Sequence, residues 1–241
     1  MPRSLPSKSV LKHVDSLILF TQEHNAGLKL LLDNLLNDFS ADSELQNYVH
    51  SMKSRIKDPE HLRDKLLRKL GDYKPEGQNF PITEQNLFTK INDLAGLRIL
   101  HLHTRQFKDI NRCLSRIFDE HYYHVIEKPS ARTWDDESRD YFKSIGIKCV
   151  RSSSMYTSVH YVIAPNQRTN YTCEIQVRTI AEELWGEVDH SLNYPHETGS
   201  LACREQIKVL ARVTSSCTRL VDSIFASHED HKPPLTKRQK P

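Results

Sequence analysis

The chain has 241 residues, of which 37% are hydrophobic and 27% charged, and this balance predicts a globular protein built as one large domain or as one domain with helical additions. The apolar run 17–20 is too short to span a membrane, and the N-terminus has no apolar segment of the kind found in signal peptides. The net charge of +3 is too small to require a nucleic-acid partner, although it permits local basic sites for phosphate groups.

The five cysteines are an odd number and include no C-x-x-C pair. This pattern argues against a disulfide framework and against a zinc site. We therefore expect a protein of the reducing cytoplasm without a membrane partner.

Residues 1–44 are predicted to form a helical segment whose role is packing. Apolar residues recur every three or four positions on both sides of a break at 25–27. Either Asp42 or Ser43 is suited to cap a further short helix.

Residues 49–57 are predicted to form a strand that leads into a helix. Asp58 is a favoured N-cap residue, and Pro59 is favoured at the first helical position. We expect this helix to end at Gly71 and a loop to follow over 71–82.

Basic residues of this strand and helix form the first candidate site. Arg55 and Lys57 would share one face of the strand, and Lys65 lies on the following helix. Three cations that converge in this way suit a polyphosphate. A solvated basic face is the commoner arrangement, so these residues alone do not identify a site.

The sequence NDLAGLRILHL predicts a small-residue turn before a strand over 97–102 that carries Arg98. It follows a short helix capped near Thr83. Asp93 either closes the turn or provides a carboxylate at the sheet edge, where a metal ion can bind.

A core helix is predicted over 106–118 and a strand over 121–127. The polar segment 128–155 is predicted to be an irregular loop of the kind that is often functional or mobile. A strand follows over 158–163, with Tyr156 at its start. This tyrosine either packs against the protein or stacks on a base.

The segment 171–190 changes from strand to helix periodicity. Glu174, Gln176 and Arg178 lie on the polar face of the predicted strand. The helix that begins at Ile180 is predicted to face inward through Leu184, Trp185, Val188 and Leu192. A carboxylate on a strand that is supported by a helix suits an active site, and the alternative is a solvated strand face.

The last helix is predicted over 201–228. Its 3,4-spaced seam consists of Cys203, Gln206, Leu210, Val213, Cys217, Leu220 and Ile224. We favour packing of this seam on the domain, and the alternative is a second subunit in a homo-oligomer. The tail 231–241 is basic, rich in proline and predicted to be disordered.

Together these motifs resemble the synthetase domain of RelA/SpoT-type proteins, the alarmone synthetases. The resemblance spans about residues 45–195. It rests on RIK…K (Arg55, Lys57, Lys65), DLAGLR (93–98), YTSVH (156–160) and EIQVRT (174–179), followed by LWGEVDH.

The resemblance implies a nucleotidyltransferase-like α/β (α+β) fold with a mixed sheet of about five strands flanked by helices. The implied organisation is a core over 45–198, the helical segment 1–44, a C-terminal helix within 199–230 and the tail 231–241. We expect no His-Asp hydrolase domain within this sequence.

The implied activity is that of a pyrophosphokinase, which transfers the β,γ-pyrophosphate of ATP to a ribose 3′-hydroxyl, usually of GDP or GTP. By this resemblance, Asp93 and Glu174 hold Mg²⁺, and Glu174 also accepts the proton of the attacking hydroxyl. Phosphoryl-type transfer depends on positioning and charge neutralisation, which agrees with these residue types.

On the ATP side, the resemblance implies that Arg55 and Arg98 sandwich the adenine. Lys57 and Lys65 are assigned to the phosphates. Arginine planes stack on a base, whereas lysine acts as a point charge on phosphate.

On the acceptor side, Tyr156 is assigned to the base and His160 to the phosphates. VRSSS replaces the family's usual Pro-Lys-x-Asn, so Lys148 or Arg151 would supply the missing cation. The assignments are completed by Gln176 and Arg178, which would support the floor of the site.

All departures from the family pattern lie on the acceptor side. Met155 precedes Tyr156 and Thr157 follows it, where family members usually have other residues. Three hypotheses therefore remain: synthesis of (p)ppGpp, transfer to the 3′ end of tRNA or to an adenosine nucleotide, and a catalytically idle nucleotide-binding module.

Overall fold

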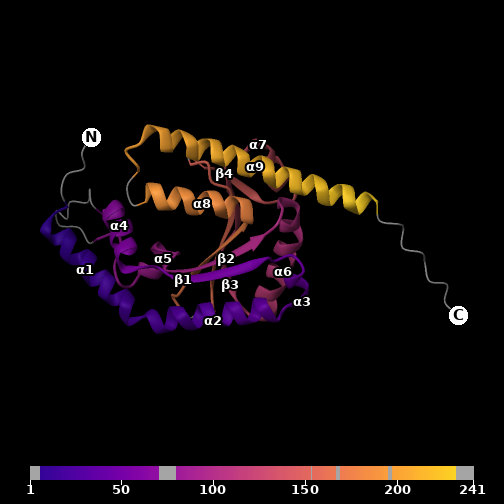
Figure 1. Cartoon of the computed structure of the whole chain (residues 1–241). Coiled ribbons are helices and arrows are strands. Elements are labelled where there is room, and N and C mark those ends of the chain that lie inside the picture. Colours follow the sequence, from indigo (N-terminus) through magenta and orange to yellow (C-terminus); the bar gives the residue numbers. More distant parts are fainter. Residues whose placement is uncertain (1–5, 71–79, 153, 167–168, 195–196, 232–241) are drawn as a thin grey trace.

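A mixed six-stranded sheet forms the centre of the computed structural model, which describes residues 6–70, 80–152, 154–166, 169–194 and 197–231 (Figure 1). The strands follow the order β1-β2-β6-β5-β3-β4 across the sheet. Their bounds are β1 (Ser51–Ile56), β2 (Ala95–His101), β3 (His124–Thr133), β4 (Lys148–Arg151), β5 (Ser158–Ala164) and β6 (Cys173–Thr179). The predicted mixed α+β architecture is confirmed, with six strands where about five were expected.

Helices cover both sides of this sheet. In chain order they are α1 (Lys8–Glu23), α2 (Asn25–Ala41), α3 (Ser43–Gln46), α4 (Pro59–Leu70), α5 (Leu87–Lys90), α6 (Phe107–Glu120), α7 (Asp136–Ser144), α8 (Ile180–Asn193) and α9 (Leu201–Asp230), with a 3₁₀ turn at Thr104–Gln106. Figure 1 shows α2 on one side of the sheet and α8 on the other, with α9 packed outside α8. None of the described helices is both long and apolar enough to cross a membrane.

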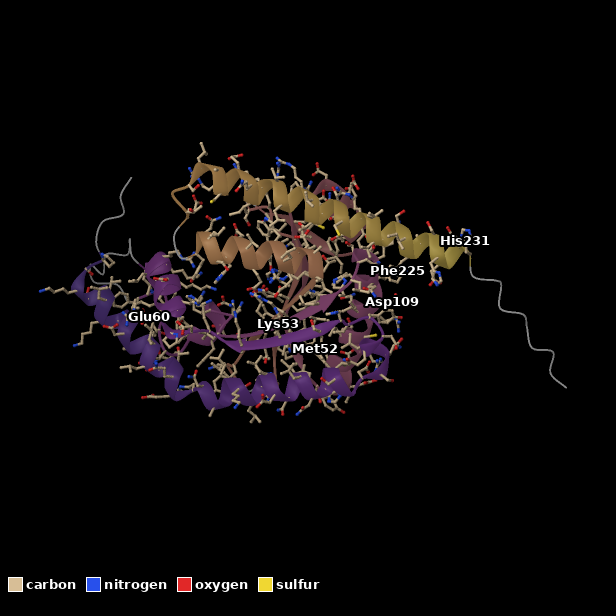
Figure 2. The ribbon with its side chains drawn as sticks, in the orientation of Figure 1. Met52, Lys53, Glu60, Asp109, Phe225 and His231 are labelled. Carbon is tan, nitrogen blue, oxygen red and sulfur yellow. The ribbon has the colours of Figure 1, made fainter. Side chains whose placement is uncertain are left out.

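The hydrophobic core lies between the sheet and the N-terminal helices. Ile99 of β2 and Ile175 of β6 are fully buried, as are Leu28 and Leu35 of α2, and all four belong to one continuous cluster. Because side chains alternate along a strand, the residues between these positions point to the opposite side, towards α8. Figure 2 labels Lys53, whose ammonium group reaches Glu183 of α8.

Several predicted local signals are present in the structure. Asp42 caps α3, since its side chain accepts a hydrogen bond from the Leu45 backbone amide at 2.7 Å. Asp58 accepts hydrogen bonds from two backbone amides in the first turn of α4. The predicted end at Gly71, most of the loop 71–82 and residues 232–241 of the tail lie outside the described residues.

The prediction of an irregular segment over 128–155 is wrong. Strand β3 continues to Thr133, and α7 and β4 follow it. Asp135 caps α7 by accepting a hydrogen bond from the Ser138 backbone amide at 2.9 Å. Since β4 lies at the sheet edge and is mostly exposed, its sequence lacks the apolar alternation that identifies a strand.

The buried face of α8 also differs from the prediction. Leu184 and Leu192 are 56% and 45% exposed, whereas Glu182 and Glu183 are buried. Glu183 is compensated by its ion pair with Arg178 of β6. Burial instead raises the pKa of Glu182, so that this carboxyl group need not be charged.

The predicted seam of α9 was assigned to the wrong face. The helix packs on α8, where Ile207 and Ala211 form one buried cluster with Trp185, and the Thr218 hydroxyl lies 3.3 Å from that of Thr179 at the end of β6. Leu220 and Ile224 of the seam are 62% and 57% exposed. Packing of α9 on the domain is therefore real, but it uses a different stripe of residues.

Candidate active site

Cross-strand pairing aligns the predicted site residues on the sheet face towards α8. Arg55 of β1 pairs with Gly96 of β2, which pairs in turn with Glu174 of β6. A second row contains, from β1 to β5, Lys53, Arg98, Gln176 and His160. Four segments that are distant in the sequence thus contribute to one surface.

A first pocket of about 180 Å³ lies over β1, β2 and β6. The predicted site residues that line it are Arg55, Asp93, Arg98, Glu174 and Gln176. Asp93 and Glu174 are close enough for the charge of Asp93 to act on the pKa of Glu174. We name this cavity the donor pocket.

Asp93 is held by two lysines. The Lys57 Nζ lies 3.0 Å from Oδ2, and the Lys65 Nζ lies 2.7 Å from Oδ1. Burial raises the pKa of Asp93, but the two ammonium groups outweigh this effect and hold the pKa below its usual value. Burial also lowers the pKa of Lys57, against the opposing effect of Asp93. The carboxylate is therefore ionised, and its charge is neutralised by cations assigned to the ATP phosphates.

Both oxygens of Glu174 have fixed partners. His160 Nδ1 lies 3.0 Å from Oε1, and Gln176 Nε2 donates to Oε2 at 2.7 Å. Tyr156 Oη in turn donates to Gln176 Oε1 at 3.3 Å. Burial raises the pKa of Glu174, but the hydrogen bonds of His160 and Gln176 and the charge of His160 bring it below its usual value. The sheet thus presents an ionised and oriented carboxylate.

A second and larger pocket of about 930 Å³ lies over β3, β4 and the start of β5. It is lined by all four residues predicted for the acceptor, namely Lys148, Arg151, Tyr156 and His160. We name it the acceptor pocket. The contact between His160 and Glu174 joins it to the donor pocket.

The acceptor pocket contains two further cations that sequence reasoning missed, Lys128 and Arg132. They lie on β3, within the segment predicted to be irregular, so their common strand face was not recognised. None of the lysines and arginines lining this pocket forms an ion pair with a residue in the described ranges. His160 Nε2 is buried and likewise has no hydrogen-bond partner there. These groups are available to a negatively charged ligand.

Arg98 and Arg178 have partners on α8 that were not predicted. Arg98 Nη1 lies 3.2 Å from Glu183 Oε1 and also pairs with Glu187. Arg178 pairs with Glu183, and its guanidinium carbon lies 5.5 Å from the centroid of the Tyr156 ring. Arg178 thus contacts Tyr156 and α8, and its role as support for the floor of the site stays a prediction.

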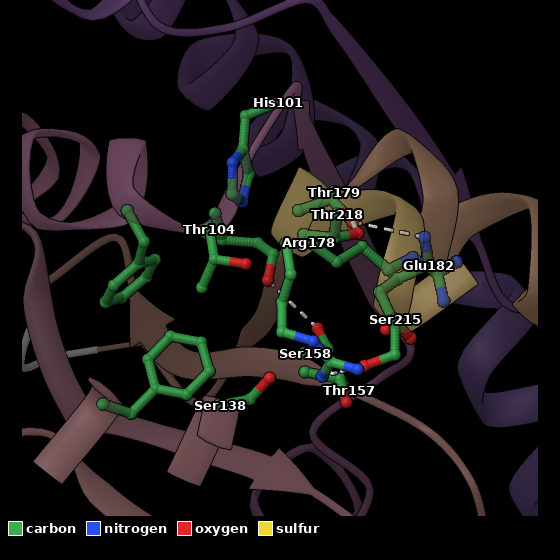
Figure 3. A pocket seen from close by; sticks show the side chains of 14 residues that line it. His101, Thr104, Ser138, Thr157, Ser158, Arg178, Thr179, Glu182, Ser215 and Thr218 are labelled. Carbon is green, nitrogen blue, oxygen red and sulfur yellow. Dashed lines mark hydrogen bonds between the residues drawn. The ribbon is translucent and has the colours of Figure 1, made fainter. Parts of the chain in front are cut away.

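A small pocket of about 20 Å³ lies at the junction of β6, α8 and α9 (Figure 3). Arg178, Glu182 and Thr218 are among the residues that surround it. Burial raises the pKa of Glu182 to about 8. Glu182 is thus mostly protonated at neutral pH, unlike its neighbour Glu183, and it belongs to the packing of α8.

The described residues contain no group of three or more His, Cys, Asp or Glu side chains arranged to hold a metal ion. Asp93 and Glu174 nevertheless suit Mg²⁺, which typically takes one or two carboxylates and completes its coordination with water and substrate phosphates. The ionised state of both carboxylates agrees with this donor set.

Comparison with known proteins connects this geometry to one family. The family described as "Region found in RelA / SpoT proteins" matches residues 54–199. GTP pyrophosphokinase YwaC of Bacillus subtilis (strain 168) is 27% identical over 177 residues, which cover 69% of this chain and 71% of that protein.

Solved structures of similar fold include the small alarmone synthetase 1 from Bacillus subtilis, with a TM-score of 0.56 and 19% identity over 90% of this chain and 97% of that one. The structure of that synthetase bound to its product pppGpp has a TM-score of 0.55 and 20% identity over 91% and 98% of the two chains. At these identities the likeness shows a shared fold.

Proposed function

The chain belongs to the RelA/SpoT family and is a pyrophosphotransferase, and we propose that it transfers the β,γ-pyrophosphate of ATP to the ribose 3′-hydroxyl of GDP or GTP, forming (p)ppGpp. The observation that carries this proposal is the position of Glu174 at the junction of two pockets. Glu174 lines the donor pocket together with Asp93, and it contacts His160 of the acceptor pocket. Two nucleotides bound in these pockets would bring their reacting groups to this carboxylate.

In the donor pocket, Arg55 and Arg98 are the residues we assign to adenine, and Lys57 and Lys65 those we assign to the phosphates. Both lysines are paired with Asp93. A triphosphate offers them a stronger partner, and their transfer to it would release the Asp93 oxygens. Asp93 and Glu174 are the ligands we assign to Mg²⁺, which would supply neutralisation of the phosphate charge.

Glu174 is the general base of this proposal. Its lowered pKa keeps it ionised at neutral pH, and it accepts the proton of the 3′-hydroxyl. The contacts from His160 and Gln176 orient the carboxylate and reduce its motion before substrate arrives.

In the acceptor pocket, Tyr156 would stack on the base, and the free Nε2 of His160 would meet an acceptor phosphate. Lys148 and Arg151 supply the cation that is missing from the family motif. Their lack of ion-pair partners in the described part of the chain supports a role in phosphate binding.

A second candidate acceptor is the 3′ end of tRNA, or an adenosine nucleotide. The size of the acceptor pocket and its two additional cations, Lys128 and Arg132, favour retaining this candidate. A catalytically idle nucleotide-binding module is the third candidate, and the retention of both carboxylates argues against it.

One transfer assay separates these candidates. The full chain is incubated with Mg²⁺ and γ-labelled ATP, in parallel with GDP, GTP, AMP, ATP alone or deacylated tRNA. We expect labelled product with GDP or GTP. Label on tRNA or on an adenosine nucleotide alone would replace the guanosine proposal by the second candidate, and the absence of transfer to any acceptor would favour the third.

The exposed seam of α9 supports assembly of the chain as a homo-oligomer. We expect the protein to act in the cytoplasm. Val213, Cys217, Leu220 and Ile224 keep 4,3,4 spacing, which is the pattern that pairs one helix with another. Light scattering should show a smaller particle for Leu220→Glu than for the unmodified chain. Equal particle masses for Leu220→Glu and the unmodified chain would contradict assembly through the seam.

A further inference from the structure

Glu183 of α8 binds cations from three different strands. Its Oε1 lies 3.0 Å from Lys53 Nζ of β1 and 3.2 Å from Arg98 Nη1 of β2. Its Oε2 pairs with Arg178 of β6. The Glu183 side chain is only 7% exposed, so these cations replace the water that an ionised carboxylate needs. Burial raises the pKa of Glu183, but the attraction of Arg178, Lys53 and Arg98 outweighs burial and lowers it.

The cations bound by Glu183 serve different pockets. Lys53 and Arg98 line the donor pocket. Arg178 instead lies against the ring of Tyr156, and Tyr156 lines the acceptor pocket. Glu183 therefore contacts both Arg98, which we assign to adenine, and Arg178, which lies against the Tyr156 ring of the acceptor pocket.

Gly186, one turn after Glu183 on α8, leaves room for the guanidinium group of Arg178. A Cβ atom at Gly186 would lie 2.7 Å from Arg178 Nη1. Any other residue at this position would therefore displace the guanidinium group from its place between α8 and β6.

We propose that Glu183 is a positioning residue that couples the two nucleotide sites, so that occupation of the donor pocket strengthens binding in the acceptor pocket and the reverse. The proposal rests on the function proposed above. When adenine binds to Arg98, the ion pair between Arg98 and Glu183 becomes weaker. The carboxylate then holds Arg178 more tightly, and Arg178 in turn fixes the Tyr156 ring for stacking. By linkage, the acceptor must improve donor binding by the same factor.

Calorimetric titration can measure this coupling directly. The full chain is titrated, in the presence of Mg²⁺, with an ATP analogue that carries a methylene group between its α- and β-phosphates and therefore cannot transfer pyrophosphate. Titrations are performed without GDP and with saturating GDP. For the unmodified chain we expect GDP to lower the Kd of the analogue at least about fivefold, the lower end of typical coupling between sites.

Three variants then test the residues involved. Glu183→Gln and Gly186→Ala should each bring the ratio of the two Kd values close to one, the first by removing the shared charge and the second by displacing Arg178. Glu187→Gln is the matched control because Glu187 pairs with Arg98 but not with Arg178. It should keep the ratio even if its affinity for the analogue changes.

Thermal unfolding shows whether each variant is folded. If Glu183→Gln does not fold, the test uses Gly186→Ala. Binding of both nucleotides to the unmodified chain with a ratio of one would overturn the coupling and leave the proposed function intact. An unchanged ratio in Gly186→Ala, or in folded Glu183→Gln, would also overturn it. If the unmodified chain binds neither nucleotide, the proposed function itself fails, and the coupling fails with it.

Discussion

The buried carboxyl group of Glu182 should make the stability of this protein fall as the pH rises. Its side chain belongs to the inward face of α8, the residue is 5% exposed, and burial raises its pKa from 4.5 to about 8. The folded chain therefore retains this proton over a pH range in which the unfolded chain releases it. The contribution of Glu182 is most favourable below about pH 4.5 and is lost as the pH rises through about 8.

The size of this effect follows from the pKa difference. A difference of about 3.5 between folded and unfolded states, at about 1.4 kcal/mol for each pKa unit, gives on the order of 5 kcal/mol across this range. Glu182→Gln carries no titrating proton, so it should remove most of this dependence. The difference in unfolding free energy between the variant and the unmodified chain should increase in favour of the variant by roughly several kcal/mol from pH 5 to pH 8.5.

Urea unfolding followed by circular dichroism at several pH values measures this quantity. Glu60→Gln is the control, because Glu60 lies on the surface of α4, with 80% of its side chain exposed. Its unfolding free energy should follow that of the unmodified chain with pH. Parallel curves for the unmodified chain and Glu182→Gln would refute the reasoning, since they would mean that Glu182 does not hold a proton in the folded state.

Further predictions concern the two pockets. Glu174→Gln and Asp93→Asn should each reduce kcat by about 10²–10⁴-fold in a chain that still folds, and retention of near-normal turnover would remove the substituted carboxylate from catalysis. Tyr156→Ala should weaken acceptor binding by about 1–3 kcal/mol in a direct titration if the ring stacks on a base; a lower melting temperature with unaltered acceptor affinity would instead identify a packing residue. Lys128→Ala and Arg132→Ala should each raise the acceptor Kd about fivefold, because a solvated charge pair contributes on the order of 1 kcal/mol, and should reduce its salt dependence. Unchanged affinity and salt dependence would place the acceptor phosphates elsewhere in the pocket.

Local signals in the sequence predicted most elements around the donor pocket. The change of period at Ile180 marks the end of β6 and the start of α8, and Asp58 and Pro59 mark the start of α4. These signals are short-range, so they do not depend on knowledge of the tertiary fold. The RelA/SpoT match confirms the family resemblance, and the residue roles that this resemblance implies stay predictions.

The failed predictions share a physical cause, which is that tertiary contacts override local pattern. Glu182 and Glu183 are polar residues that become buried because protonation or ion pairing compensates for the loss of water. Lys128 and Arg132 were overlooked because this part of β3 is mostly polar and exposed and lacks the apolar alternation that identifies a strand. The partners of Arg178 on α8 depend on the packing of a helix against a strand and could not be read from spacing.

The parallel pairing of β2 with β6 has a consequence for synthesis of the chain on the ribosome. Asp93 and Glu174 are brought together by two neighbouring strands whose connection contains the other half of the sheet. No fragment that ends before β6 contains both carboxylates, and a slip of one residue in this pairing would turn Glu174 towards the apolar core. Nascent chains should therefore remain inactive until β6 has emerged and paired with β2 in the correct register.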